Sequence, residues 1–309
     1  MEFDHQPVLV EEMLTYLKIN PSGCYVDGTL GRGGHSFALL SKLNEQGKII
    51  ALDRDRQAIN AVQEETDDER LILVHENYIN IPEVLNKLGV KKVDGMYFDL
   101  GFSSPQVDNP RRGFSYHRDG PLDMRMNRQQ SLNAEEIVNS FSKAKLAKII
   151  KEYGEENWAE RIAEFIVKFR EQKKIKTTTR LVEVIKKAIP ASARRKGGHP
   201  ARRTFQALRI AVNNELEQLK EMLSAVVSRL VSGGRVAVIS FHSLEDRIVK
   251  HTFKNMALKC VCPPDFPECF CDKEQTLKII TKKPVSASEN EIENNKRARS
   301  AKLRVGEKI

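Results

Sequence analysis

The sequence begins without an apolar stretch as long as a signal peptide or a membrane-spanning helix. Its first residues, MEFDHQPVLVEEM, carry acidic side chains from the second position onward. A signal peptide needs a continuous apolar segment, and a helix needs about 20 apolar residues to cross a bilayer. This segment therefore predicts a cytoplasmic protein with no membrane partner.

Tryptophan is scarce, with one residue in 309, although 40% of the residues are hydrophobic. A chain of this length can bury one large core or two moderate ones. Two domains are therefore compatible with the composition. The composition leaves the oligomeric state open, and a homodimer is one of the arrangements it permits.

A GxGxxG dinucleotide fingerprint is missing from the glycine-rich segment DGTLGRGGHS at 27–36. This segment follows a short apolar run and precedes a helix-like one, so it predicts a tight turn at a helix N-terminus. The pattern D-x-x-x-G-x-G places Asp27 where it can bond a cationic amino acid moiety, whereas it would repel a pyrophosphate. The turn favours S-adenosylmethionine over NAD, and Asp53 at the end of the next apolar run predicts a ribose contact.

Strand and helix patterns alternate through the first hundred residues and then stop. Apolar runs predict strands at 24–27, 48–53, 71–75 and 93–99, with helices between them. This alternation predicts an α/β fold with a mostly parallel sheet. Helical periodicity dominates from 108 to 206, and strand patterns return at 235–241, 276–282 and 301–305, the last two as an antiparallel pair. We expect a Rossmann-like domain, 1–107 and 207–309, with an inserted all-helical domain, 108–206.

Acidic charge is scarce in the predicted insertion. Residues 108–206 hold 23 Lys and Arg against 12 Asp and Glu, whereas the rest of the chain holds 28 against 30. A basic surface predicts a polyanionic partner, and solvated basic helices are the alternative. The basic residues cluster around the loop at 197–200, and the candidate phosphate contacts are Arg194, Arg195, Lys196, Arg202 and Arg203.

The fourth predicted strand ends in DLGFSSPQ at 99–106, which lacks the two adjacent prolines common in amino-methyltransferases. Ligands bind at the carboxyl edge of an open α/β sheet, so Asp99 is a candidate acceptor for an exocyclic amine. Phe102 is a candidate to stack on a base. Turn capping or cofactor binding by Asp99 are the alternatives.

Cysteine is also rare, but four of the five cysteines form two tight pairs, Cys260-Val-Cys262 and Cys269-Phe-Cys271. In a reducing cytosol this pattern suggests zinc before disulfides, and incidental thiols in a proline-rich loop are the alternative. Cys24 lies in a predicted strand and is expected in the core.

Four long motifs in order resemble the family of ribosomal RNA small-subunit methyltransferase H, also called MraW. They are DGTLGRGGHS (27–36), DLGFSSPQ (99–106), RGFSYHRDGPLDMRM (112–126) and SFHSLEDRIVK (240–250). The resemblance spans essentially the whole chain. It implies a class I S-adenosylmethionine-dependent methyltransferase fold with a helical substrate domain, and methyl transfer to the N4 of a cytidine in the decoding centre of 16S rRNA within the small ribosomal subunit.

The resemblance also implies site residues. The cofactor would be bound by Gly33, Gly34, His35, Asp53, Tyr78, Asp99 and Gln106. The resemblance implies no metal. We expect the target cytidine in a pocket formed by Phe102, Phe114 and Tyr116, with Asp99 and Phe102 as the catalytic residues.

Two other functions remain open from the residues alone, an NAD-dependent oxidoreductase and a ribosome-assembly factor without activity. His242 and Ser243 either contact base or cofactor or form a helix cap, with Ser243 at the N-cap and Asp246 three residues later.

Overall fold

The structure is a computed structural model that describes residues 7–195, 198–263, 268 and 270–309. The chain forms two compact units. One comprises Met1–Gly101 with Leu216–Ile309, and the other comprises Phe102–Glu215. The second unit is therefore inserted into the first.

The first unit contains a seven-stranded sheet in the order β3-β2-β1-β4-β5-β7-β6. The first five strands are parallel to their neighbours, whereas β7 is antiparallel to both β5 and β6. The chain order reverses between β1 and β4, which is where doubly wound sheets bind ligands. The strands are β1 (Cys24–Asp27), β2 (Lys48–Asp53), β3 (Leu71–His75), β4 (Val93–Asp99), β5 (Leu230–Ser240), β6 (Leu277–Ile279) and β7 (Lys302–Lys308).

Both faces of this sheet are covered, because successive residues of a strand point to opposite sides. In β4, Met96 and Phe98 join one hydrophobic cluster while Tyr97 joins the other. The first cluster includes side chains of α4, α12 and α13, and the second includes side chains of α1, α2 and α3. Continuous apolar runs such as Lys48–Asp53 are therefore central strands buried on both faces.

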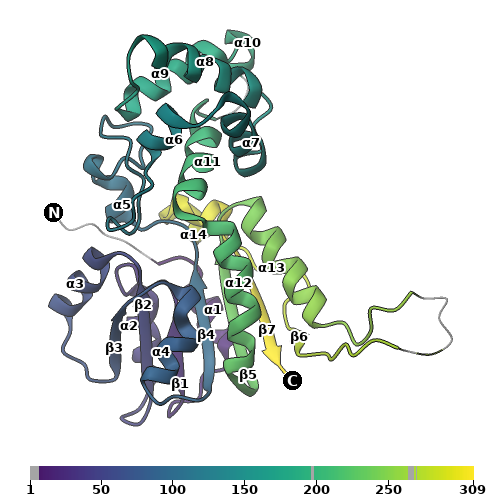
Figure 1. Ribbon diagram of the computed structural model, residues 1–309. Helices are drawn as coiled ribbons and strands as arrows, with labels where there is room; N and C mark the ends of the chain where they lie inside the picture. The colour runs from purple at the N-terminus through teal and green to yellow at the C-terminus, as the bar shows by residue number, and fades with distance from the viewer. Residues whose placement is uncertain (1–6, 196–197, 264–267, 269) are drawn as a thin grey trace. The chain divides into compact units, whose positions relative to one another are not determined.

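The helices of this unit follow from amphipathic spacing and from caps such as Asp55, which accepts a bond from the Gln57 amide at the start of α3. Figure 1 shows them around the sheet. They are α1 (Val10–Leu17), α2 (Gly34–Leu40), α3 (Arg56–Glu65), η1 (Tyr78–Asn80), α4 (Ile81–Lys87), α12 (Glu215–Val226), η3 (Val227–Arg229), α13 (Ser243–Met256), α14 (Glu289–Asn294) and η4 (Lys296–Ser300).

The second unit is a helical domain with its own core. Apolar residues one helical turn apart meet inside it, such as Ile162 and Ile166 of α8 and Leu181 and Ile185 of α9. Its elements are α5 (Ser104–Asp108), η2 (Pro110–Arg112), α6 (Ala134–Ser140), α7 (Lys143–Gly154), α8 (Ala159–Gln172), α9 (Thr178–Ala188), α10 (Ala191–Arg194) and α11 (Arg202–Asn213).

The predicted fold class, a mostly parallel α/β sheet with an inserted helical region, is confirmed. The unit Phe102–Glu215 is wider than the predicted 108–206. The sequence boundary at 206 fell inside α11, whose buried face continues through Leu208 and Val212 into the same core. Strand β5 also begins earlier than the predicted 235.

Within the ranges that the structure describes, no helix is both long enough and apolar enough to cross a membrane.

Candidate functional site

The glycine-rich turn joins β1 to α2 with backbone that only glycine adopts readily. Gly31 has φ +55° and Gly33 has φ +79°. A Cβ on Gly33 would lie 2.8 Å from the Phe37 ring, and one on Gly34 would lie 2.9 Å from Pro7. Gly33 and Gly34, the predicted cofactor contacts of this turn, therefore lie where a side chain would clash with its neighbours.

Asp53, at the end of β2, fixes this turn from the neighbouring strand. One carboxylate oxygen accepts the Gly31 amide at 2.9 Å, and the other accepts the Asp55 amide at 2.8 Å. Burial raises the pKa of this carboxyl, and the two backbone bonds oppose the shift. The predicted ribose contact thus comes from a side chain that the turn itself holds in place.

Asp27 is buried and bonded within the chain. Its oxygens accept the Thr29 amide at 2.9 Å and the Ser36 hydroxyl at 2.7 Å, and Ser36 lies 2.9 Å from the Tyr97 hydroxyl. Burial raises the pKa of Asp27 to about 6. In this structure Asp27 stabilises the turn with bonds to the chain's own donors, a use that differs from the predicted bond to an amino group.

The His35 ring lies between the N-terminal segment and the end of β4. Its Nε2 is 2.9 Å from the Val8 carbonyl oxygen, and its Nδ1 is 3.8 Å from an Asp99 oxygen. Burial lowers the pKa of His35, which favours the neutral ring. A neutral ring that donates from Nε2 to Val8 turns an acceptor nitrogen toward Asp99, so it gives that carboxylate no proton.

Asp99 ends β4 and is the least satisfied charged group of this edge. Its amide donates to the Thr29 hydroxyl at 2.6 Å, which fixes its backbone. Its Oδ1 is buried and has no hydrogen-bond partner among the described residues. Burial, and secondly the charge of Glu245, raise the pKa of Asp99 to about 7. Buried polar atoms without partners are rare, and this one points to a missing donor.

The segment after β5 forms a helix cap one residue earlier than the sequence predicted. His242 is the N-cap of α13, and the Glu245 carboxylate accepts the Phe241 amide at 2.9 Å and the His242 amide at 3.3 Å. The predicted pair of Ser243 at the N-cap and Asp246 at N3 is wrong, because α13 begins at Ser243 and Asp246 pairs with Arg304 at 2.6 Å.

Two further predicted cofactor residues, Tyr78 and Gln106, contact neighbouring residues of their own unit. The Tyr78 ring in η1 is 7% exposed and meets the Phe98 ring edge-on at 6.1 Å between centroids. Gln106 belongs to the helical unit, where its Oε1 accepts the Ser103 amide at 3.1 Å in the capping box of α5. Their contact with a cofactor remains a prediction.

The helical unit brings Phe102 and Phe114 together, with ring centroids 6.2 Å apart. Phe102 is 43% exposed, whereas Phe114 is 7% exposed. The guanidinium carbon of Arg209 lies 4.9 Å from the Phe102 ring centroid, and Arg209 forms two bonds to Glu215 at 2.9 and 2.7 Å. Phe102 thus presents an exposed ring that packs against Phe114 and the Arg209 guanidinium.

Tyr116 belongs to a different aromatic group. It stacks on His199 at 4.7 Å between centroids and meets Phe205 edge-on at 5.7 Å, and His117 lies beside it at 4.5 Å. Burial, together with His117 and Lys186, lowers the pKa of His199. The pocket expected from Phe102, Phe114 and Tyr116 stays a prediction; in the structure the Phe102 ring contacts Phe114, and the Tyr116 ring contacts His117, His199 and Phe205.

Four of the five predicted phosphate contacts have exposed side chains, Arg194, Arg195, Arg202 and Arg203. Lys196 lies outside the described residues. The Arg203 guanidinium donates to the Glu155 carbonyl at 2.8 Å, so it is partly fixed within the unit. The other three leave an exposed basic surface near the His199 loop.

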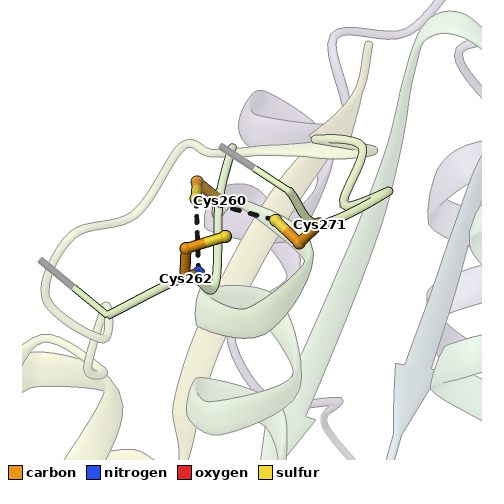
Figure 2. Close-up of side chains that lie close together, drawn as sticks. All are labelled: Cys260, Cys262 and Cys271. Carbon is orange, nitrogen blue, oxygen red and sulfur yellow. Dashed lines mark hydrogen bonds between the residues drawn. The ribbon is translucent and has the colours of Figure 1, made fainter. Parts of the chain in front are cut away.

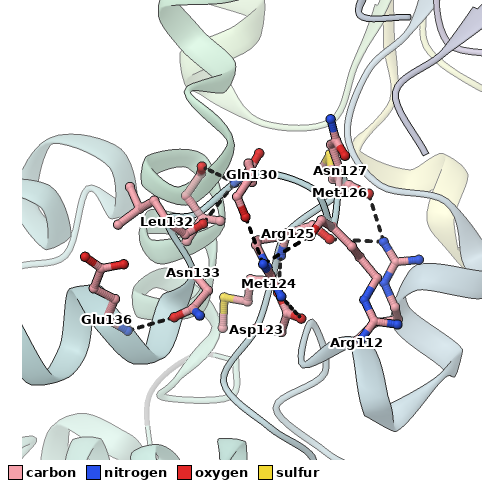
Figure 3. Close-up of polar contacts among 12 residues, drawn as sticks. Arg112, Asp123, Met124, Arg125, Met126, Asn127, Gln130, Leu132, Asn133 and Glu136 are labelled. Atoms are coloured by element: carbon pink, nitrogen blue, oxygen red, sulfur yellow. Dashed lines mark hydrogen bonds and ion pairs between the residues drawn. The ribbon is translucent and has the colours of Figure 1, made fainter. Parts of the chain in front are cut away.

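The motif at 112–126 is mainly structural (Figure 3). The Arg112 guanidinium, 2% exposed, donates to the carbonyls of Arg125 and Met126 at 3.0 and 3.1 Å. Arg125 pairs with Asp123 at 2.6 Å, and Asn133 caps α6 by accepting the Glu136 amide at 2.8 Å. Both arginines are bonded to groups of the helical unit itself, so they contribute to its structure.

Sequence reasoning missed the residues that orient the edge. Thr29 and Tyr97 bond the backbone of Asp99 and the Ser36 hydroxyl, and Glu245 raises the pKa of Asp99. Thr29 lies inside the recognised glycine motif, so its position was a signal. Glu245 lies 146 positions from Asp99 in the chain, and only the pairing of β4 with β5 joins them.

Comparison with known proteins gives one consistent result. The model of the MraW methylase family matches residues 2–309. A protein of Halothermothrix orenii named ribosomal RNA small subunit methyltransferase H is 60% identical over 99% of both chains. Proteins of the same name from Clostridioides difficile and Heliobacterium mobile are 53% and 51% identical over the full length of both chains. With the fold, the glycine turn and the buried carboxylate in place, this chain belongs to the MraW methylase family.

Proposed function

We propose that this chain transfers a methyl group from S-adenosylmethionine to the N4 of a cytidine in the decoding centre of 16S rRNA, within the small ribosomal subunit. The observation that carries the proposal is the buried Asp99 Oδ1 at the carboxyl end of β4, which has no hydrogen-bond partner in the part of the chain that the structure describes. An amine donor would satisfy this atom. The names of the full-length relatives support rRNA of the small subunit as the substrate class.

The carboxyl edge of the sheet carries the groups that would hold S-adenosylmethionine. Gly33, Gly34 and His35 form the turn, and Asp53 holds that turn while remaining partly accessible. Tyr78 lies after β3, where an aromatic edge would border an adenine. Together with Asp99, these are the residues of the first unit that would hold the cofactor.

S-adenosylmethionine, when bound, supplies an electrophilic methyl group on a sulfonium whose positive charge is lost on transfer. Asp99, as a carboxylate, accepts an N–H of the target amine and so localises the nitrogen lone pair for attack. Thr29 fixes the backbone of Asp99, and the neutral His35 ring turns an acceptor nitrogen toward its carboxylate, which leaves the carboxylate able to accept from the amine. Rate acceleration comes from orientation and electrostatics, and no covalent enzyme intermediate is needed.

The helical unit supplies chemistry suited to RNA. Residues 102–215 carry 24 Lys and Arg against 13 Asp and Glu, so this unit holds the excess positive charge. Phe102 offers an exposed ring for stacking on a base, and Arg194, Arg195 and Arg202 offer exposed guanidiniums for phosphates. Each of these residues contributes to holding single-stranded rRNA for reaction.

The test is transfer of labelled methyl from S-adenosylmethionine to small subunits that lack the modification, followed by nuclease digestion and identification of the nucleoside. Label in N4-methylcytidine supports the proposal. Label in another nucleoside overturns the substrate, and absence of label under demonstrated cofactor binding overturns the activity. Binding of NADH without binding of S-adenosylmethionine would reverse the choice of cofactor.

A further inference from the structure

Three cysteine side chains meet in the segment that connects α13 to β6 (Figure 2). The sulfur atoms of Cys260, Cys262 and Cys271 all lie within 4.8 Å of one another. The segment begins after Met256 and ends before Leu277, and the Thr276 amide donates to the Met256 carbonyl at 3.0 Å. The three cysteines therefore lie between Met256 and Thr276, which this backbone hydrogen bond ties together.

The distances within this cluster suit a metal ion better than a disulfide. Cys271 Sγ lies 3.6 Å from Cys260 Sγ. A disulfide requires sulfur atoms about 2.05 Å apart. Zinc–sulfur bonds of about 2.3 Å in a tetrahedral site place two sulfur atoms about 3.8 Å apart. The observed separation is close to the edge of such a tetrahedron.

Backbone amides point at two of the sulfur atoms. The Val261 amide donates to Cys271 Sγ at 3.4 Å, and the Cys262 amide donates to Cys260 Sγ at 3.3 Å. Hydrogen bonds that end on sulfur stabilise the thiolate over the thiol. In metal sites, hydrogen bonds of this kind orient the thiolates that bind the metal, and here the backbone next to the cysteines supplies them.

We propose that Cys260, Cys262 and Cys271 bind a Zn²⁺ ion that clips this loop together. A set of sulfur ligands selects a thiophilic cation, and oxygen-preferring ions such as Mg²⁺ bind poorly to it. Cys269 lies outside the described residues and is not assigned a ligand role. A metal that joins residues 260–262 to residue 271 closes the segment between them and so lowers the conformational entropy of the unfolded chain.

The cluster and the methyltransfer edge involve different residues, so the zinc site is independent of the proposed function. Exposed Val261 and Phe270 lie next to its ligands, with 55% and 71% of their surfaces accessible. The clip would hold these apolar side chains in one arrangement.

The experiment measures metal in the full-length protein by elemental mass spectrometry. The protein is saturated with Zn²⁺ under reducing conditions and then dialysed against metal-free buffer. We expect about one zinc ion per chain in the wild type, and at least about tenfold weaker binding in Cys260→Ser and Cys271→Ser. Replacement by Co²⁺ should give the intense near-ultraviolet absorption of cobalt–thiolate bonds.

Cys24→Ser is the matched control, because Cys24 lies in β1 and burial raises the pKa of its thiol to about 11. This variant should retain the zinc ion of the wild type. Unfolding curves of all variants separate loss of metal from loss of fold. The proposal is overturned if the wild type loses its zinc on dialysis, if Co²⁺ shows no thiolate absorption, or if the loop variants retain the metal.

Discussion

Asp99 at the sheet edge and Arg112 in the helical unit are both charged side chains with a buried end, and they differ in how the chain satisfies them. The Arg112 guanidinium donates to two carbonyl oxygens of the loop after it, at 3.0 and 3.1 Å. The Asp99 carboxylate keeps a buried oxygen with no partner among the described residues. A buried charge that bonds to the chain's own carbonyl oxygens supports a fold, whereas a buried carboxylate oxygen that the described residues leave without a donor costs stability and is retained where chemistry needs it.

The largest expected effect is on transfer in Asp99→Ala. Removing the acceptor for the target amine should lower the rate of methyl transfer by about 10²–10³-fold, the usual size for loss of one electrostatic contact to a transition state. The rate is measured with labelled S-adenosylmethionine and small subunits. An activity within a few fold of the wild type would show that the unsatisfied oxygen has no catalytic use.

Arg112→Met should lower the stability of the protein, in contrast to Asp99→Ala, whose main effect is on the rate of transfer. Hydrogen bonds to a charged group contribute about 1.5–3 kcal/mol each, and two carbonyl oxygens lose their donor. We expect the free energy of unfolding to fall by about 3 kcal/mol in urea titrations. Arg111→Met is the matched control, because Arg111 is exposed and should change stability little. Equal effects of the two substitutions would refute the structural role.

The pH dependence of stability tests whether the buried Asp99 carboxylate costs stability. The pKa of Asp99 rises from 3.8 to about 7 in the folded protein, so the folded state binds a proton more tightly than the unfolded state. Its contribution to the free energy of unfolding therefore falls as pH rises between about 4 and about 7. Asp99→Asn removes this loss and should be more stable than the wild type at pH 8, by roughly 1–3 kcal/mol.

Urea unfolding at pH 4, 6 and 8 measures this difference. The stability difference between Asp99→Asn and the wild type should shrink toward pH 4, because near the ordinary pKa of 3.8 the unfolded chain also begins to bind the proton that the folded protein already holds. A difference that stays constant with pH would contradict the burial of this charge.

The smallest expected effect concerns the exposed arginines. The triple variant with Gln at Arg194, Arg195 and Arg202 should bind rRNA about tenfold more weakly and lower the salt dependence of binding by about 2–3 released counterions. Stability should not change, because these side chains are exposed.

A control triple variant carries Gln at Lys143, Lys148 and Lys151 of α7, with the same change of charge in the same unit. Fluorescence anisotropy with a labelled rRNA fragment, repeated at several salt concentrations, compares the two variants. If both lose affinity equally, the basic unit acts through its total charge and the arginine cluster has no special part.

The sequence predicted the first four strands with the bounds that the structure has, because runs such as Lys48–Asp53 are apolar on both faces and end at polar residues. It also predicted that Asp99 ends a strand at the binding edge. Spacing could not predict the contacts of that edge. Thr29 bonds the Asp99 backbone, and Glu245 raises the pKa of Asp99, only because strands β1 and β5 both pair with β4.

The helical unit was harder to predict in detail. The positive charge of residues 108–206 was visible in the sequence, but α11 continues past that boundary because its apolar face packs into the same core. Exposed and buried arginines look alike in a sequence, so Arg112 and Arg202 could not be told apart. The partner of Tyr116 also depended on His199, which lies 83 positions away.

The most direct test of the central claim is the pH profile of kcat/KM for S-adenosylmethionine in the wild type and in Asp99→Asn. This ratio reports ionisation in the free enzyme, where the pKa of Asp99 is raised to about 7. The account predicts that the wild-type value rises about tenfold per pH unit below that point and levels above it, while the low value of Asp99→Asn shows no such rise. A wild-type profile that is flat across neutral pH, or one that Asp99→Asn reproduces, would contradict it.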